Sequence, residues 1–239
     1  MTAAFLWGGL AACSLLIGYL LAERGLSSRT IGLIMGFGAG ALISAIAYEL
    51  VPESAVGDWS MAGFFVLGAL VFFGGDWIVD HRGGAHRKKI KGHEDSGSGA
   101  AIFVGTLLDN IPESMVLGMG LAMGGSISVA FLLAVFISNL PEGIAGTANL
   151  AKAGHSRRSM LWMWLSLVLI SAASAALGFG IVEWLPTSDG SLAQAFAAGA
   201  MLTMLADAMM PEAFEHGGRL VGLFTVLGFG VAAGLSMLE

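Results

Sequence analysis

Two short segments near the middle of the chain combine an Asn, a Pro and a Glu in the same order: residues 109–114 (DNIPES) and 138–143 (SNLPEG). Each lies halfway along an apolar segment that carries no charge outside its motif. A charged group at the centre of a bilayer costs roughly 2.5–3.5 kcal/mol. Asp109, Glu113 and Glu142 therefore cannot face lipid and must face one another, water or a cation. This pattern predicts a protein that moves a cation.

The spacing within each motif places its polar side chains on one helix face. An oxygen-bearing residue stands four positions before each Glu, and an Asn stands three before it. The candidate metal ligands are Asp109, Asn110, Glu113, Ser138, Asn139 and Glu142. Pro112 and Pro141 lack an N–H, so the carbonyl oxygens of Leu108 and Ile137 are also released. A ligand set of oxygens favours Mg²⁺, Ca²⁺ or Mn²⁺, whereas imidazole suits Zn²⁺ and Fe²⁺ better.

The composition is that of an integral membrane protein. Hydrophobic residues make up 56% of the 239 residues and charged residues 12%, against about 25% charged in soluble domains. The 36 Gly favour close helix packing within lipid. The 13 Met are interpreted as apolar filler of the core. Cys13 is the only cysteine, which excludes an intrachain disulfide and a thiolate metal cluster.

The hydropathy pattern predicts an all-α protein with eight transmembrane helices in a single domain spanning residues 1–239. A membrane-spanning helix needs about 20 apolar residues. The segments of that length are 3–21, 31–51, 61–80, 101–122, 127–148, 160–183, 192–213 and 220–238.

The basic residues predict the orientation of these helices. All 11 Lys and Arg fall in the breaks after the first, third, fifth and seventh segments. By the positive-inside rule these breaks are cytoplasmic. We therefore expect a multi-pass protein of the plasma (inner) membrane with both termini outside the cytoplasm. The longest of these breaks, residues 81–99, is expected to be a cytoplasmic loop rich in His and basic residues.

An internal repeat supports a transporter. Residues 40–53 match residues 199–212 without a gap, and the two copies cross the membrane in opposite directions. The two Asn-x-Pro-Glu motifs are inverted in the same way. The alternative is a kinked helix pair whose acids stay protonated, and the inverted pair of motifs makes this the weaker interpretation. Helices 1–3 and 6–8 are thus predicted to be inverted halves around a central hairpin of helices 4 and 5. Inverted repeats with a site at their junction are typical of secondary transporters.

Paired Asn-x-Pro-Glu motifs on helices 4 and 5 of an eight-helix protein, with termini outside and a His-containing loop after helix 3, resemble the ZIP (zinc/iron-regulated-transporter-like) family of metal transporters, in its bacterial form. The resemblance covers essentially the whole chain. It implies a binuclear metal site at the midplane. One metal would be surrounded by Asp109, Glu113, Ser138 and Glu142, and the second by Asn110, Asn139 and the bridging Glu142.

The chain departs from the family pattern at three places. The family commonly has His where this chain has Asp109, and Gln or His where it has Ser138. Helix 6 of the family frequently supplies an acid, whereas this chain offers Ser166, Ser171 and Ser174 there. We therefore expect one well-formed metal site, whose ligands suit harder cations than those of the usual family site. The substrate is expected to be Zn²⁺ by family, with Mn²⁺ or Fe²⁺ suited to the oxygen ligands.

Further charged residues suggest the ends of a metal path. The family places a metal exit near Glu212, Glu215 and His216 at the end of helix 7, close to Asp76 and Asp80 at the end of helix 3; a plain interfacial charge cluster is the alternative. Glu49 and Glu53 near the outer end of helix 2 are candidates for the entrance. In the loop, His81, His86 and His93 are candidates for capturing or releasing metal, although a solvated basic loop explains them as well.

The sequence therefore predicts secondary transport of a divalent metal into the cytoplasm, and no enzyme. The chain has no Gly-x-x-x-x-Gly-Lys-Ser/Thr loop and so cannot be its own P-loop ATPase. The alternatives are an intramembrane metal-dependent hydrolase built on the same acids and a metal sensor that does not transport. Metal ions and membrane lipid are the expected partners, with no nucleic acid. Gly32, Gly36 and Gly40 form a ridge for close helix packing, with a homodimer contact as the alternative reading.

Overall fold

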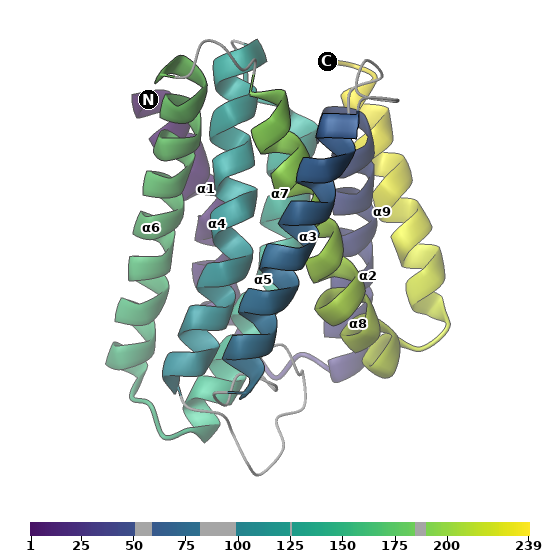
Figure 1. Cartoon of the computed structure of the whole chain (residues 1–239). Helices are drawn as coiled ribbons and strands as arrows, with labels where there is room; N and C mark the ends of the chain where they lie inside the picture. The colour runs from purple at the N-terminus through teal and green to yellow at the C-terminus, as the bar shows by residue number, and fades with distance from the viewer. Residues whose placement is uncertain (51–58, 82–98, 125, 185–189) are drawn as a thin grey trace.

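The computed structural model describes residues 1–50, 59–81, 99–124, 126–184 and 190–239 (Figure 1). These residues form α-helices, short π-helical segments and turns and contain no strand, so the predicted all-α fold is confirmed. The elements are α1 (Thr2–Ala22), α2 (Ser28–Ala45), η1 (Ile46–Leu50), α3 (Trp59–Val79), α4 (Gly99–Gly124), α5 (Val129–Lys152), α6 (Arg157–Trp184), α7 (Ser191–Met204), η4 (Leu205–Met209), α8 (Met210–Gly217) and α9 (Leu220–Ser236).

The predicted spans are found in place. In the described ranges, α2 continues into η1, and α7 continues through η4 into α8, so these elements form eight continuous helical spans. Six of the described helices are long and apolar enough to cross a membrane, and α9 is an apolar helix of 17 residues. Both motif prolines lie inside their helices, Pro112 in α4 and Pro141 in α5. The chain is an all-α membrane protein.

Polar residues precede the first turns of α2 and α5. The Oγ atom of Ser27 accepts a hydrogen bond from Thr30 N, and that of Ser128 accepts one from Phe131 N, each at 3.1 Å. These side chains satisfy amide groups that have no partner within the first turn of α2 and α5. Gly218 has a φ of 63° and separates α8 from α9, since this left-handed conformation favours glycine.

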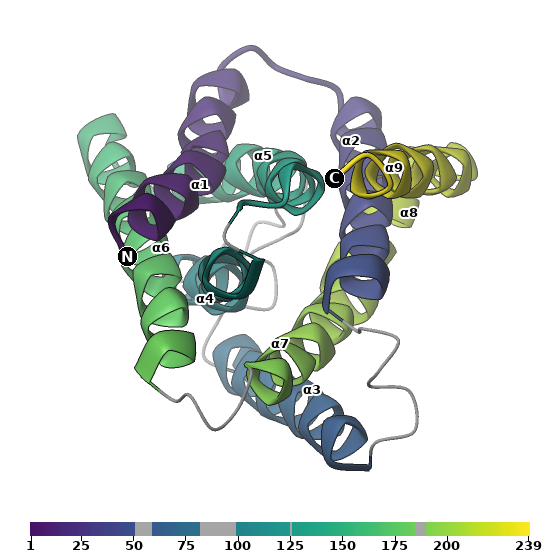
Figure 2. The ribbon, with the colours of Figure 1, turned by 90° about the horizontal axis from the view of Figure 1, so that it is seen from above.

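Seen from above, the helices form two bundles (Figure 2). In the first, which we call the motif bundle, α1 packs on α5 and α6, and α4 packs on α6. In the second, the scaffold bundle, α2 packs on α8 and α9, and α3 packs on α7. The contact of α2 with α5 is the largest between the bundles. Both Asn-x-Pro-Glu motifs therefore lie in one bundle and face the other.

The inverted repeat is visible in the backbone as well as in the sequence. The π-helix η1 at 46–50 aligns with the π-helix η4 at 205–209 when the two repeat copies are superimposed in sequence. Both π-helices lie just before a proline, at Pro52 and Pro211. Short π-helical turns are uncommon within α-helices and occur often at functional sites. Their matched positions support the assignment of two related halves.

Four glycines in the scaffold bundle make close contacts that follow the inverted repeat. Each lies so close to a neighbouring helix that a Cβ atom would overlap a backbone carbonyl oxygen. The contacts are Gly40 with Thr225, Gly228 with Phe37, Gly199 with Phe65, and Gly68 with Phe196. Gly40 aligns with Gly199, and Phe37 aligns with Phe196. The α2–α9 and α3–α7 interfaces are therefore two copies of one arrangement.

The glycine ridge on α2 packs against other helices of the same chain. Gly32 lies against Ala213 and Gly217, and Gly36 lies against Val221. Together with the contact of Gly40 on α9, these approaches cover the ridge with α8 and α9. The predicted close helix packing is confirmed, and this ridge is not free to form a homodimer contact because its surface is buried within one chain.

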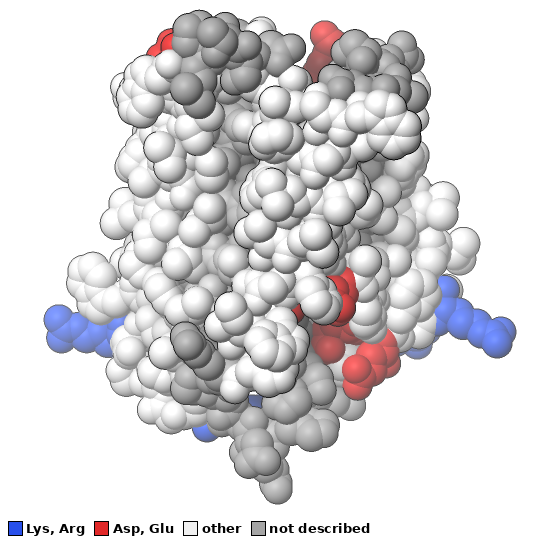
Figure 3. All heavy atoms as spheres, viewed as in Figure 1, with Lys and Arg blue, Asp and Glu red and all other residues white. Residues whose placement is uncertain are grey.

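The two ends of the molecule differ in charge. Both termini lie at the same end (Figure 1), and the visible Lys and Arg side chains gather toward the opposite end (Figure 3). The latter end holds the turns from α1 to α2, from α5 to α6 and from α8 to α9, where the described basic residues are found. We call it the basic end and the other the terminal end.

Candidate metal centre

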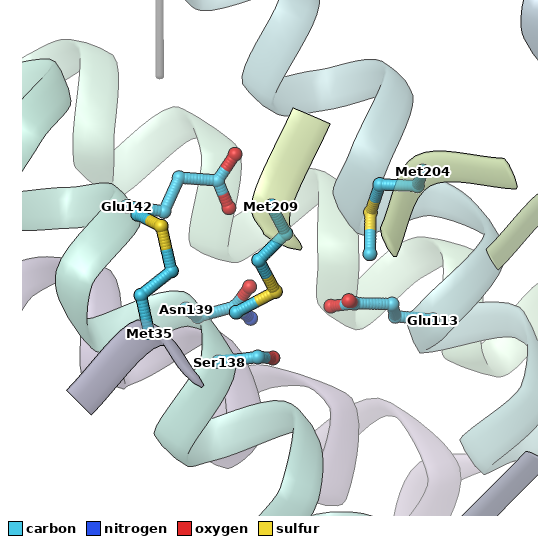
Figure 4. A pocket seen from close by; sticks show the side chains of 7 residues that line it. All are labelled: Met35, Glu113, Ser138, Asn139, Glu142, Met204 and Met209. Atoms are coloured by element: carbon cyan, nitrogen blue, oxygen red, sulfur yellow. The ribbon is translucent and has the colours of Figure 1, made fainter. Parts of the chain in front are cut away.

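One small pocket lies between the two bundles and gathers residues from both motifs. Its oxygen-bearing lining comes from Glu113 of α4 and from Ser138, Asn139 and Glu142 of α5. Glu113, Ser138 and Asn139 are buried, with exposed fractions of at most 4%, and Glu142 is partly buried. In the close view, the carboxylates of Glu113 and Glu142 enter the pocket from its two sides (Figure 4). The fold thus brings together oxygen atoms from two helices that run in opposite directions.

A chain of hydrogen bonds links the two motifs beside the pocket. Asn139 Nδ2 donates to Asn110 Oδ1 at 3.1 Å, and Asn110 Nδ2 donates to the carbonyl oxygen of Thr106 at 3.0 Å. The hydroxyl of Ser138 donates to the carbonyl oxygen of Val135 at 2.9 Å, which leaves its lone pairs available to a cation. These bonds hold the polar side chains in fixed orientations and so reduce the entropy lost on binding an ion.

The structure separates the six candidate ligands into two sets. Glu113, Ser138, Asn139 and Glu142 line the pocket, whereas Asp109 and Asn110 do not. Both of the latter are buried, at 2% and 1% exposure. Since α4 runs from the basic end toward the terminal end, Asp109 lies one helical turn nearer the basic end than Glu113. The Oδ1 atom of Asn110 is engaged by Asn139.

The other wall of the pocket is made of methionines. Met35 of α2, Met204 of α7 and Met209 of η4 complete the lining, and all three come from the scaffold bundle. The sequence-based interpretation of all methionines as core filler did not distinguish these three. The spacing of residues along a helix does not show which side chains of the scaffold bundle face the pocket between the bundles. No local signal in the sequence identifies these three among the 13.

The size of the pocket limits what it can hold. Its volume is about 20 Å³, and a single water needs roughly 10–15 Å³. The pocket therefore accommodates one water-sized particle. A divalent cation with its full shell of water does not fit, but one dehydrated cation in contact with the lining atoms does.

A second group of metal-binding side chains lies toward the basic end, on α8. Ligand atoms of Glu212, Glu215 and His216 lie within 4.8 Å of one another. His216 Nδ1 is 3.1 Å from Glu212 Oε1. Glu212 is 6% exposed, while Glu215 is open to the surface. Figure 3 shows acidic side chains gathered in this region, near the level of the basic residues.

Comparison with known proteins identifies a relative that is similar over most of this chain. The chain is 30% identical over 196 residues to an Arabidopsis thaliana protein named "Putative zinc transporter", a match that covers 77% of this chain and 30% of that relative. The chain thus spans less than a third of the length of the relative. No family model matches the chain.

The chain belongs to the ZIP family. The resemblance drawn from the paired motifs is confirmed, and the positions where this ZIP protein departs from the family pattern can now be located. Ser171 and Ser174 of α6 are buried, and Ser166 donates to the carbonyl oxygen of Met163. None of the three lines the pocket. The acid that other ZIP proteins frequently place on helix 6 has no counterpart among them.

Glu49, one of the two residues predicted for the entrance of this ZIP protein, lines a second small cavity toward the terminal end. Glu49 of η1, Ser128 and Phe131 of α5, and the buried Gln194 of α7 are among its lining residues, and its volume is about 30 Å³. Phe131 and Ser138 are seven residues apart on α5, or about 10 Å along the helix. The hydroxyl of Ser236 donates to Glu49 Oε1. Glu53, the other candidate, lies outside the described residues.

The C-terminal residue joins the two bundles at this end. Glu239 Oε1 accepts hydrogen bonds from Val129 N at 2.6 Å and from Ala130 N at 3.0 Å. Glu239 follows α9 of the scaffold bundle, and the two amides begin α5 of the motif bundle. A carboxylate is favoured at a helix N-terminus by the helix dipole as well as by the hydrogen bonds.

The remaining predicted site residues of the ZIP chain lie at the end of α3 or outside the described residues. Asp76 of α3 is buried, at 5% exposure, and Asp80 follows that helix; neither belongs to the group formed by α8. His81 lies 2.8 Å from the carbonyl oxygen of Trp77 through Nδ1, and its ring packs on the Trp77 ring at 4.1 Å. His86 and His93 lie outside the described residues.

Proposed function

We propose that this chain transports divalent metal cations across a membrane toward the cytoplasm, by a secondary mechanism. The observation that carries the proposal is the pocket between the bundles, which is lined by Glu113 and Glu142 from the two inverted motifs. Two carboxylates in a buried site of this size are best compensated by a cation of charge two. The pocket supports a single dehydrated metal ion as the transported species.

The proposed site consists of Glu113, Ser138, Asn139 and Glu142. Asn110 is proposed to position Asn139, which is supported by the hydrogen bond from Asn139 to Asn110. Asp109, one turn nearer the basic end on the same helix face, is proposed to receive the ion as it leaves toward the cytoplasm. One metal in the pocket, instead of two, is proposed, and the pocket volume of about 20 Å³ supports this number.

The two further groups define the ends of the proposed path. Glu49 and Gln194 line the cavity toward the terminal end, and Glu212, Glu215 and His216 form the group toward the basic end. An ion passing from one to the other crosses the central pocket, which lies between the bundles. We propose that the motif bundle moves against the scaffold bundle to open the pocket to each side in turn, as expected for inverted repeats.

Zinc is the first metal to test, because the name of the Arabidopsis relative refers to zinc. Mn²⁺ is the second, because oxygen ligands suit it, and Fe²⁺ is the third. Purified protein in liposomes that enclose a metal-sensitive dye should admit one or more of these ions faster than empty liposomes. Metal binding without flux would indicate a sensor. Neither binding nor flux would refute the proposed function. Substrate cleavage would favour an intramembrane hydrolase, which usually needs His or Cys ligands for a catalytic zinc.

The Asp109→His variant tests the role of Asp109. An imidazole favours Zn²⁺ over Mn²⁺, so the ratio of zinc to manganese flux is expected to rise about tenfold, which corresponds to 1.4 kcal/mol. Competition uptake in liposomes measures this ratio, with Asp109→Asn as the matched variant that removes the charge and adds no imidazole. An unchanged metal order in Asp109→His would show that Asp109 does not contact the ion.

The His216→Ala variant tests the group on α8. Removal of the imidazole is expected to slow metal release to the cytoplasmic side about tenfold, a loss typical of removing a partner of a metal ligand. Metal affinity of the central pocket should stay as in the wild type. Uptake rates and equilibrium binding together measure the two effects. The control is Glu23→Gln, which removes an acid at the same end whose partner is the exposed Arg157; a similar slowing there would point to general surface charge.

A further inference from the structure

We propose that Met35, Met204 and Met209 are sulfur ligands that set the metal preference of the central pocket. The inference rests on the proposed transport function and identifies the class of cation that the site favours. That class is soft cations such as Cd²⁺ and Cu⁺, selected over hard cations such as Mn²⁺ and Ca²⁺. The oxygen atoms of the motif bundle hold the charge of the ion, and the thioethers of the scaffold bundle discriminate by softness.

The three side chains are placed for this role. Their exposed fractions are 2% for Met35, 3% for Met204 and 5% for Met209, so none is a surface side chain. All three line the pocket together with both carboxylates. Figure 4 shows Met209 between the two glutamates, Met204 next to Glu113 and Met35 next to Glu142 in that view. Sulfur therefore faces the pocket from three separate segments of the scaffold bundle.

Because the pocket is small, an ion within it must contact the methionine sulfurs directly. A cavity of about 20 Å³ leaves no room for a shell of water around the ion. The ion must therefore complete its coordination with the atoms that line the wall, and on the scaffold side those atoms belong to methionines. Thioethers bind soft cations and give little to hard ones, which prefer carboxylate, carbonyl and water. A hard cation would lose its water on that side and gain no comparable ligand.

The internal repeat shows that the scaffold does not need methionine for its packing. The aligned positions of the other copy carry different side chains: Gln194 for Met35, Ala45 for Met204 and Leu50 for Met209. Both copies pack through the same glycine contacts described above. In each of these three aligned pairs, methionine therefore occurs only in the copy that borders the pocket.

Replacement by leucine separates ligation from packing. Leucine is close to methionine in volume and apolar character, and such exchanges usually cost little stability, but it offers no sulfur. We expect Met35→Leu/Met204→Leu/Met209→Leu to weaken Cd²⁺ binding at least about tenfold, or 1.4 kcal/mol, and to leave Mn²⁺ binding nearly unchanged. The measurements are equilibrium binding of Cd²⁺ and of Mn²⁺ to the purified full chain, and competition between them in liposome uptake. Met201→Leu is the control, because Met201 is buried in α7 but does not line the pocket.

X-ray absorption at the cadmium edge tests the ligands directly. The wild-type protein with bound Cd²⁺ is expected to show sulfur in the first coordination shell, and the triple variant oxygen alone. Oxygen alone in the wild type, or equal loss of Cd²⁺ and Mn²⁺ binding in the triple variant, would overturn the inference. In both cases Mn²⁺ or Zn²⁺ flux through the wild type would leave the proposed function standing, whereas absence of all metal flux would refute that function first.

Discussion

Glu142→Gln is expected to lower metal flux at least about 100-fold, the upper end of the losses known for groups that merely support metal ligands. Glu142 is one of the two carboxylates of the pocket, so its neutralisation leaves a single negative charge to offset a divalent ion that has lost its water. Glutamine has nearly the same shape, so the fold should be retained. The initial rate of metal uptake into liposomes, at equal amounts of incorporated protein, is the measurement.

The control for this variant is an acid away from the pocket. Glu183 near the end of α6 is exposed, and Glu183→Gln changes the net charge of the chain by the same amount. Its flux should stay close to that of the wild type. Thermal unfolding of both variants in detergent checks that the loss in Glu142→Gln is not a loss of folded protein. Near-normal flux in a folded Glu142→Gln protein would remove this residue from the transport site.

The second large effect is expected in the scaffold bundle. A Cβ atom at Gly40 would overlap the carbonyl oxygen of Thr225, and one at Gly199 would overlap that of Phe65. Because a backbone atom cannot rotate away, the helices must separate. We expect Gly40→Ala to destabilise the protein by about 2–3 kcal/mol. The corresponding fall in the unfolding temperature is about 5–10 °C for a chain of this size.

The aligned glycine provides a test of the repeat itself. Gly199→Ala is expected to cost about as much as Gly40→Ala, and the double variant about the sum, because the two contacts lie in different interfaces. Gly74→Ala on α3 is the matched control, since a Cβ there meets no atom within 4 Å. Alanine favours a helix over glycine by about 1 kcal/mol, so this control should not lower stability. Unfolding followed by size-exclusion fluorescence measures all four proteins. A Gly40→Ala protein as stable as Gly74→Ala would contradict the close approach.

Much of the fold was predictable from the sequence because membrane helices are set by local composition. The low content of charge and the length of the apolar segments fix where helices begin and end, and the observed bounds follow those segments closely. The inverted repeat was also readable, since residues 40–53 and 199–212 match without a gap. The π-helices η1 and η4 were not predicted, because no propensity rule distinguishes a π-turn from the α-helix around it.

The candidate site was predictable in part. Acids that cannot face lipid must converge, and this reasoning named Glu113 and Glu142, which line one pocket. It also grouped Asp109 with them, because residues four apart share a helix face. Helix periodicity fixes the direction of a side chain but not the depth of the cavity that it reaches. For that reason only the structure separated Asp109 and Asn110 from the pocket.

The sequence by itself determined the helices, their inverted halves and the pair of motifs, since these depend on interactions between residues near one another in the chain or on transfer into lipid. The tertiary structure decided which residues meet across the two bundles. Met35, Met204 and Met209 come from segments up to 174 positions apart in the chain, and they lie opposite the glutamates only because α2 and α7 pack around α5 and α4. The contrast between an oxygen wall and a sulfur wall is a product of that packing, which no local pattern of residues encodes.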